Sequence, residues 1–141
     1  MYSYEYPRPS VTADIALIDP QRHELLLIRR GHEPYKDCWA LPGGFFDMSD
    51  PDIAFTAHRE LEEETGLKGL ELKEMLVASR EGRDPRGRTI SVIFMALVDR
   101  STLEARGGDD AAEARWFSLQ ELPPLAFDHG EIVEQLLRNI E

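Results

Sequence analysis

The segment 59–67 restricts the fold and chemistry of this chain more than any other part of it, because it gathers three acidic side chains on one side of a predicted helix. Residues three and four apart share a helical face, so Glu60, Glu63 and Glu64 project together, whereas Glu62 points away. Like charges at this spacing repel by roughly 0.2–0.5 kcal/mol per exposed pair. The pattern therefore predicts a cation among the three carboxylates, and a hard divalent ion such as Mg²⁺ prefers such oxygen ligands.

The same segment resembles the signature of a known family. Residues 59–67 fit the second half of the Nudix box, R-E-(aliphatic)-x-E-E-x-G-(aliphatic), at every position, and the L-P-G-G of residues 41–44 is its usual lead-in. The front half departs from the pattern, because eight residues instead of seven separate Asp50 from Arg59. We interpret this as one extra residue in the preceding loop, with Asp50 or Asp47 in place of the first glutamate of the box.

The Nudix resemblance implies roles for the matching residues. Glu63 and Glu64 are expected to bind Mg²⁺, or Mn²⁺ in its place, with the carbonyl of Gly44 as a further oxygen ligand. Glu60 is expected to act as a ligand or as the general base, and Arg59 to hold Glu60 in position or to reach Glu63. The alternative interpretation is a solvated acidic helix face, which the accompanying arginine and glycines disfavour.

A second candidate for the general base lies in the acidic loop 107–113. In several Nudix branches a carboxylate from this region completes the metal site or activates water. Glu113 is our first choice there and Asp110 our second. An ordinary exposed turn flanked by glycines is an equally good interpretation of this loop.

The segment 79–89 carries four arginines against two acidic residues, on a chain whose net charge is −11. Guanidinium groups bind phosphate oxygens well, so we predict a clamp for a diphosphate, with a solvated hairpin tip as the alternative. The predicted clamp residues are Arg80, Arg83, Arg86 and Arg88.

Flanking segments 4–9 and 125–129 resemble the ADP-ribose pyrophosphatase branch of the Nudix family. In these segments, Phe127, His129 or an early tyrosine could stack on a base, or could equally form packing contacts. The resemblance implies a homodimer. Trp39 and Trp116 are expected to be structural.

Length, net charge and cysteine content limit the possible domain organisation, partners and location of the protein. A chain of 141 residues suits a single domain, 1–141, with one core. Its acidic balance argues against nucleic acid as a partner. No apolar run is long enough to cross a bilayer, and no signal layout opens the chain, so we expect a soluble cytoplasmic protein without a membrane partner. Cys38 is the only cysteine, which excludes an intramolecular disulfide.

The hydrophobic pattern predicts an alternation of strands and helices. A hairpin is expected over 11–18 and 24–30, further strands over 39–44, 70–80, 89–98 and 113–117, a turn of helix over 118–122, and helices over 52–65 and 129–140. Asp52 is the expected N-cap of the acidic helix and Gly66 its stop. This order suggests an α/β/α sandwich around a mixed sheet, and the Nudix resemblance implies the same fold.

The resulting hypothesis is an Mg²⁺-dependent hydrolase that cleaves a diphosphate linkage in a nucleoside diphosphate derivative, with ADP-ribose as the leading substrate. A nucleoside triphosphate pyrophosphohydrolase is the enzymatic alternative. The other alternative is a sensor of ADP-ribose or an NAD metabolite, as in repressors that also carry a winged-helix part. We expect no room for such a part after residue 141, and this chain keeps all three box carboxylates, so an enzyme is favoured.

Overall fold

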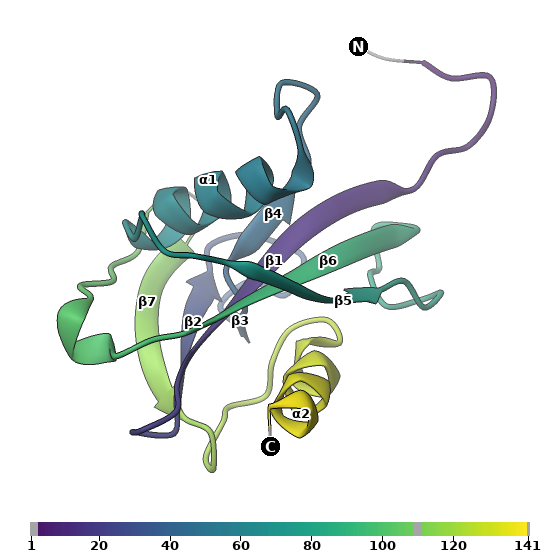
Figure 1. Ribbon diagram of the computed structural model, residues 1–141. Coiled ribbons are helices and arrows are strands. Elements are labelled where there is room, and N and C mark those ends of the chain that lie inside the picture. The colour runs from purple at the N-terminus through teal and green to yellow at the C-terminus, as the bar shows by residue number, and fades with distance from the viewer. Residues whose placement is uncertain (1–2, 109–110, 141) are drawn as a thin grey trace.

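The computed structural model describes residues 3–108 and 111–140. Two helices lie on opposite faces of a central sheet, which confirms the predicted α/β/α sandwich (Figure 1). The strands are β1 (Ser10–Asp19), β2 (Glu24–Arg30), β3 (Trp39–Ala40), β4 (Gly43–Phe45), β5 (Lys73–Ala78), β6 (Thr89–Leu97) and β7 (Ala111–Ser118). Within the described residues, no helix combines the length and apolar character that crossing a membrane requires.

The sheet is mixed, as predicted, because strand β1 has neighbours of both directions. It pairs antiparallel with β2 and β4 and parallel with β6. The main order of strands is β3-β2-β1-β6-β5, with β4 beside β1 and β7 beside β2. The hairpin expected over 11–18 and 24–30 is therefore confirmed.

Both faces of β1 are buried, which explains its nearly continuous apolar sequence. Successive side chains of a strand point to opposite faces. Ile15 and Leu17 pack in the core that contains helix α1 (Ile53–Thr65), whereas Ile18 packs in the core beneath helix α2 (His129–Asn139). The sheet thus separates two hydrophobic layers, each closed by one helix.

Helix α1 begins and ends as the sequence predicts. The side chain of Asp52 accepts a hydrogen bond from the Phe55 amide at 2.8 Å, which satisfies one unpaired donor of the first turn. Gly66 adopts a left-handed φ of 79°, and its amide donates to the carbonyl of Glu62. Because Ala57 and Leu61 are buried against the sheet, the adjacent side of the helix, which carries Glu60 and Glu64, is held in a fixed position.

Several boundaries differ from the sequence prediction. The strand expected over 70–80 is confined to β5, and the strand expected over 113–117 extends over all of β7. The helical turn expected over 118–122 is wrong, since a short turn closed by the Glu121 amide and the Ser118 carbonyl stands there. A 3-10 helix at Arg100–Thr102 was not expected.

Candidate active site

A pocket of about 430 Å³ opens between the two helices at one end of the sheet. Its volume falls within the range of small-molecule sites. Segments distant in the sequence meet there: β1, the L-P-G-G turn, helix α1, the loop between β5 and β6, and the start of α2. Among the residues that line it are Asp14, Gly44, Glu60, Glu64, Arg86 and Phe127.

The structure separates the three glutamates of the box. Glu60 and Glu64 line the pocket, whereas Glu63 lies outside it with a side chain 39% exposed. Glu64 is buried, and one of its oxygens accepts a hydrogen bond from the Gly43 amide at 2.8 Å. Glu62 is exposed, as its place on the helix predicts.

Gly44 lies against the carboxyl group of Glu60. A Cβ atom at this position would overlap all three carboxyl atoms, so only glycine lets the turn approach the helix so closely. Of the four expected metal ligands, the structure brings Gly44, Glu60 and Glu64 together around the pocket and leaves Glu63 outside it.

Arg59 joins the carboxylates of the box to the loop before the helix. Its Nε and Nη2 atoms donate to the two oxygens of Asp50 at 3.1 and 2.7 Å, and its Nη1 donates to Glu60 at 2.7 Å and to Glu63 at 3.4 Å. Hydrogen bonds from Arg59 hold the pKa of Asp50 well below its usual range, and those to Asp50 and Glu60 raise the pKa of Arg59. Asp50 is therefore the aspartate that faces the box arginine. Asp47 contacts Asp50 through its backbone, since its N–H donates to the Asp50 carboxylate and its carbonyl accepts from the Asp50 amide.

Arg59 is also a cation within the acidic cluster, so the chain itself relieves part of the repulsion expected from the spacing of the glutamates. In the described part of the chain, no three His, Cys, Asp or Glu side chains converge into a complete metal site. The donors present are nevertheless all oxygens, and Mg²⁺ commonly takes only one or two carboxylates and completes its shell with water and substrate phosphate. The residues therefore fit such an ion as partial ligands.

Glu113 lies apart from this cluster. It faces Arg29 across the β2–β7 ladder and does not line the pocket. Its carboxylate accepts from Arg115 at 2.7 Å and pairs with Arg29 at 3.5 Å, and the hydrogen bond from Arg115 lowers its pKa. The other candidate base, Asp110, lies outside the described residues.

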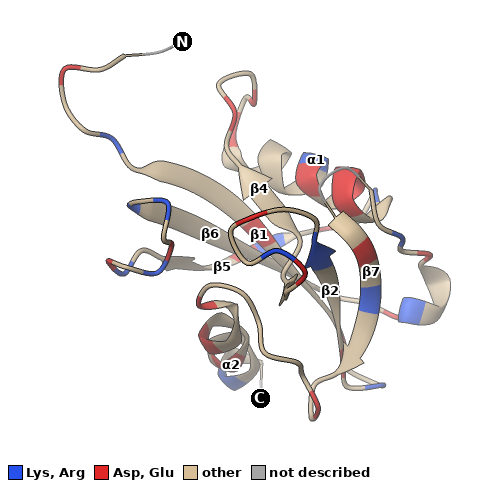
Figure 2. Cartoon of the chain, turned by 180° about the vertical axis from the view of Figure 1, so that it is seen from behind, with Lys and Arg blue, Asp and Glu red and all other residues tan. Residues whose placement is uncertain are grey.

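The four arginines predicted to form a clamp divide into two pairs. Arg80 and Arg88 are on the exposed side of the loop, in ion pairs with Glu131 and Glu81, and do not line the pocket. Figure 2 shows that this loop, between β5 and β6, carries charges of both signs. The remaining pair, Arg83 and Arg86, lines the pocket.

Arg83 and Arg86 differ in what their guanidinium groups contact. Arg83 is 7% exposed, donates to both oxygens of Asp128 at 2.9 and 2.8 Å, and donates to Ser91 at 2.8 Å. Arg86 binds Asp84 at 2.9 Å and lies 4.8 and 5.3 Å from the ring centroids of Phe45 and Phe127. Arg83 therefore links the β5–β6 loop to Asp128 and Ser91 within the protein. Arg86 places its positive charge beside two aromatic rings of the pocket.

Two residues on the α2 side support this arrangement. The buried ring of His129 accepts a hydrogen bond from the Leu41 amide on Nδ1 at 3.0 Å, which requires the neutral ring with its proton on Nε2. Burial also lowers the pKa of His129. Phe127 holds a strained φ of 55° and packs on Tyr35 at 4.8 Å between centroids. His129 is thus an anchor for the L-P-G-G turn, not a residue exposed for stacking.

Asp14 is a pocket residue that the sequence prediction missed. It stands in the apolar strand β1, is 7% exposed, and lines the floor of the pocket. A carboxylate within a strand buried on both faces was the available signal, since such a group costs free energy unless something pairs with it.

The whole chain was compared with known proteins. Residues 8–136 match the family model described as the NUDIX domain. The chain belongs to the Nudix family. An ADP-ribose pyrophosphatase of Methanocaldococcus jannaschii is 42% identical over 134 residues, which cover 94% of this chain and 76% of that protein.

Solved structures of Nudix domains also resemble this Nudix protein over nearly its whole length. The NUDIX domain of Shewanella oneidensis NrtR, complexed with ADP ribose, superposes with a TM-score of 0.89 at 27% identity and covers 96% of this chain and 91% of that one. A bifunctional NMN adenylyltransferase/ADP ribose pyrophosphatase from Francisella tularensis, complexed with AMP and an Mn ion, gives 0.84 at 31% identity, covering 98% of this chain and 44% of that one. The resemblance inferred from the box is confirmed.

Proposed function

We propose that this Nudix hydrolase cleaves the diphosphate linkage of a nucleoside diphosphate derivative, with ADP-ribose as the leading substrate and AMP and ribose 5-phosphate as products. The observation that carries the proposal is one pocket with oxygen ligands on one wall and the Arg86 guanidinium beside Phe127 on the other. The similarity to an ADP-ribose pyrophosphatase supports the choice of substrate.

The carboxylate wall would hold the metal. Glu60, Glu64 and the carbonyl of Gly44 are its ligands in our proposal, with Glu63 reaching in from outside the pocket. When bound, Mg²⁺ or Mn²⁺ would neutralise charge on the phosphate oxygens. The protein orients the two carboxylate ligands by hydrogen bonds. Arg59 fixes the orientation of Glu60, and the Gly43 amide fixes that of Glu64.

Proton transfer from the attacking water is assigned to Glu60. A general base must lie within hydrogen-bond reach of the water, and Glu60 is a pocket carboxylate whose side chain is 15% exposed. Glu113 is a weaker candidate, because Arg115 and Arg29 hold its carboxylate outside the pocket.

The arginine wall would bind the rest of the substrate. Arg86 offers charge to a phosphate, and its neighbour Phe127 offers a ring to a planar base. Arg83 contributes indirectly by fixing the loop, because its side chain is 3% exposed and bound to Asp128 and Ser91, whereas Arg86, although paired with Asp84, is 37% exposed.

Three finer features belong to the same proposal. The net charge of −11 supports a small nucleotide and not nucleic acid as the partner. A cytoplasmic location rests on the composition. A homodimer rests on the family resemblance.

A sensor without catalysis is the second candidate function. It is favoured by the high structural similarity to the NrtR domain that was crystallised with ADP ribose. The presence of all three box glutamates in this chain favours the enzyme.

Chromatography of the products decides between these functions. Purified protein is incubated with ADP-ribose, with and without Mg²⁺, and with the common nucleoside triphosphates for comparison. The proposal expects AMP and ribose 5-phosphate only when the metal is present. Binding of ADP-ribose without product in Mg²⁺ or Mn²⁺ would establish the sensor, and preferential hydrolysis of a triphosphate would establish the pyrophosphohydrolase.

A further inference from the structure

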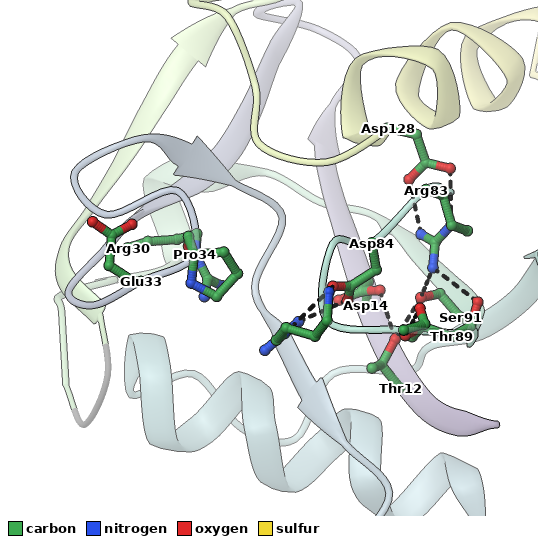
Figure 3. A network of polar contacts seen from close by, with 12 residues as sticks. Thr12, Asp14, Arg30, Glu33, Pro34, Arg83, Asp84, Thr89, Ser91 and Asp128 are labelled. Atoms are coloured by element: carbon green, nitrogen blue, oxygen red, sulfur yellow. Dashed lines mark hydrogen bonds and ion pairs between the residues drawn. The ribbon is translucent and has the colours of Figure 1, made fainter. Parts of the chain in front are cut away.

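The floor of the pocket holds a buried polar network that the proposed chemistry does not use (Figure 3). Thr12 donates to an oxygen of Asp14 at 3.1 Å and shares a 2.5 Å hydrogen bond with Ser91. Ser91 in turn accepts from Arg83, which is bound to Asp128. A chain of polar contacts therefore runs from the start of α2 to a carboxylate at the bottom of the pocket.

Asp14 differs from the other buried aspartates. Asp19, Asp50 and Asp84 each accept hydrogen bonds from an arginine side chain. Among the residues that the structure describes, Asp14 forms no ion pair with a lysine or arginine, and its hydrogen-bond donors are hydroxyl groups, although the nearby Arg83 and His129 favour its ionised form. Burial raises its pKa, so the charged form is unfavourable in the free protein.

Asp14 also lies next to the metal-binding wall. It is paired in register with Gly43, and a Cβ atom on Gly43 would overlap the carboxylate of Asp14. The amide of Gly43 donates to Glu64. One glycine therefore separates Asp14 from a candidate metal ligand, so a group attached to a phosphate held at that metal would come within reach of Asp14.

We propose that Asp14 determines specificity by accepting hydrogen bonds from the hydroxyl groups of the pentose next to the cleaved diphosphate. An ionised carboxylate only accepts hydrogen bonds, and the vicinal hydroxyls of a pentose are donors of matching spacing. Carboxylates bind ribose hydroxyls in this way in dinucleotide sites. A phosphate is disfavoured at the same place because its charge has the same sign.

The inference rests on the proposed function, since it takes a nucleoside diphosphate derivative as the ligand. It adds that the wild-type pocket distinguishes ribose from 2-deoxyribose. The hydroxyls of Thr12 and Ser91 complete the floor, because each can donate or accept and so can adapt to a bound sugar.

The test measures binding of four product analogues in Mg²⁺: AMP, 2′-deoxy-AMP, ribose 5-phosphate and 2-deoxyribose 5-phosphate. Titration calorimetry gives each dissociation constant without any turnover. We expect at least one hydroxylated ligand to bind about tenfold to a hundredfold more tightly than its deoxy analogue, as a hydrogen bond to a charged group implies. Which pair shows the difference identifies the sugar involved.

The variant Asp14→Asn should reduce that ratio to about threefold or less, mainly by weakening the hydroxylated ligand. The matched control is Glu62→Gln, which makes the same charge change on the exposed side of α1 outside the pocket and should leave the ratio as in the wild type. Asp14→Asn should also raise the melting temperature, because it removes an unfavourable buried charge, whereas a purely structural Asp14 would lower it.

The outcomes are separable from those of the proposed function, which depends on hydrolysis of ADP-ribose by the wild type. Equal binding of ribose and deoxyribose ligands by the wild type overturns the inference even if hydrolysis is fast, and needs no folded variant. Absence of binding by all four ligands overturns it too. If Asp14→Asn instead changes the Mg²⁺ concentration needed for activity while the ratio persists, Asp14 is a metal ligand and the inference is wrong.

Discussion

The two walls of the pocket are built in the same way but carry opposite charges. The carboxylate wall belongs to helix α1 and is called the α1 wall here, and the arginine wall, which lies near the start of α2, is called the α2 wall. On the α1 wall, Arg59 forms a bidentate pair with Asp50, and its neighbour Glu60 faces the pocket. On the α2 wall, Arg83 forms a bidentate pair with Asp128, and Arg86 of the same loop faces the pocket. In each case an ion pair with a buried or largely buried aspartate joins two segments of the chain, and a nearby residue carries the charge that a ligand would meet.

The difference between the walls lies in the charge that is left for the ligand. The α1 wall offers carboxylates, which suit a metal, and the α2 wall offers a guanidinium, which suits a phosphate directly. A diphosphate needs both, since one side is held through an ion and the other by the protein. The comparison predicts that residues facing the pocket affect turnover or binding, whereas residues in the buried pairs affect stability first.

The largest effect is expected at Glu64. Glu64→Gln keeps the shape of the side chain but removes a charged metal ligand, so kcat should fall by about 10²- to 10³-fold, because several kcal/mol of charge stabilisation are lost. Steady-state assays with ADP-ribose measure the change, and circular dichroism checks the fold.

The matched control for Glu64→Gln is Glu62→Gln, two residues away on the exposed side of the same helix. It should retain nearly full activity. Similar kcat values for the two variants would remove the distinction between the pocket face and the solvent face of α1.

The next largest effect is expected at Asp50. Asp50→Asn cannot form an ion pair with Arg59, so the melting temperature should fall on the order of 10 °C, and activity should fall with it as Glu60 loses its support. Asp47→Asn is the control, since Asp47 contacts Asp50 through its backbone. Differential scanning fluorimetry of both variants tests the assignment, and a larger loss in Asp47→Asn would reverse it.

Local sequence rules predicted the α1 wall well. The spacing of the glutamates, the Asp52 cap and the Gly66 stop all act within a few residues, so the sequence alone contains them. The contacts of Arg59 with Glu60 and Glu63 were expected for the same reason, whereas its pair with Asp50 was not. The sequence did not show that Glu63 would lie outside the pocket, because this depends on how α1 rotates against the sheet.

The α2 wall was predicted less well, because its contacts join distant segments. Arg83 is bound to a residue 45 positions away, so its sequence neighbours gave no sign that its charge would be buried and occupied. The strand that carries Glu113 pairs with β2, and only this pairing brings Arg29 next to it. The sequence shows Asp14 within an apolar strand, but only the pairing of β1 with β4 brings it next to Gly43.

A smaller effect separates Arg83 from Arg86. Arg86→Ala should raise KM for ADP-ribose about tenfold with little change in kcat, as loss of uniform binding does. Arg83→Ala should instead lower the melting temperature, because it leaves Asp128 without its buried partner. Both variants are therefore examined by steady-state kinetics and by melting curves, and each should change only one of the two measurements strongly. A KM effect in Arg83→Ala without any loss of stability would mean that Arg83 contacts the substrate.

The smallest effect concerns a buried carboxylate away from the pocket. The carboxylate of Asp19 accepts hydrogen bonds from the amides of Arg100 and Arg22, and these lower its pKa from 3.8 to about 2. A lowered pKa in the folded state stabilises the protein above the unfolded value, and this contribution is lost as the pH falls from about 4 towards 2. Asp19 should therefore behave as Asp50 does, and not as the pocket residues do.

Melting curves between pH 7 and pH 2 test this expectation. Asp19→Asn should melt lower than the wild type at pH 7, and the gap should narrow as the pH falls from about 4 to about 2, because the carboxylate takes up a proton first in the unfolded and then in the folded state. Glu62→Gln, on the exposed face of α1, should follow the wild-type curve throughout. Since Asp19 does not line the pocket, turnover at neutral pH should hardly change. A constant gap at every pH would show that Asp19 stabilises the fold by packing and not by its charge.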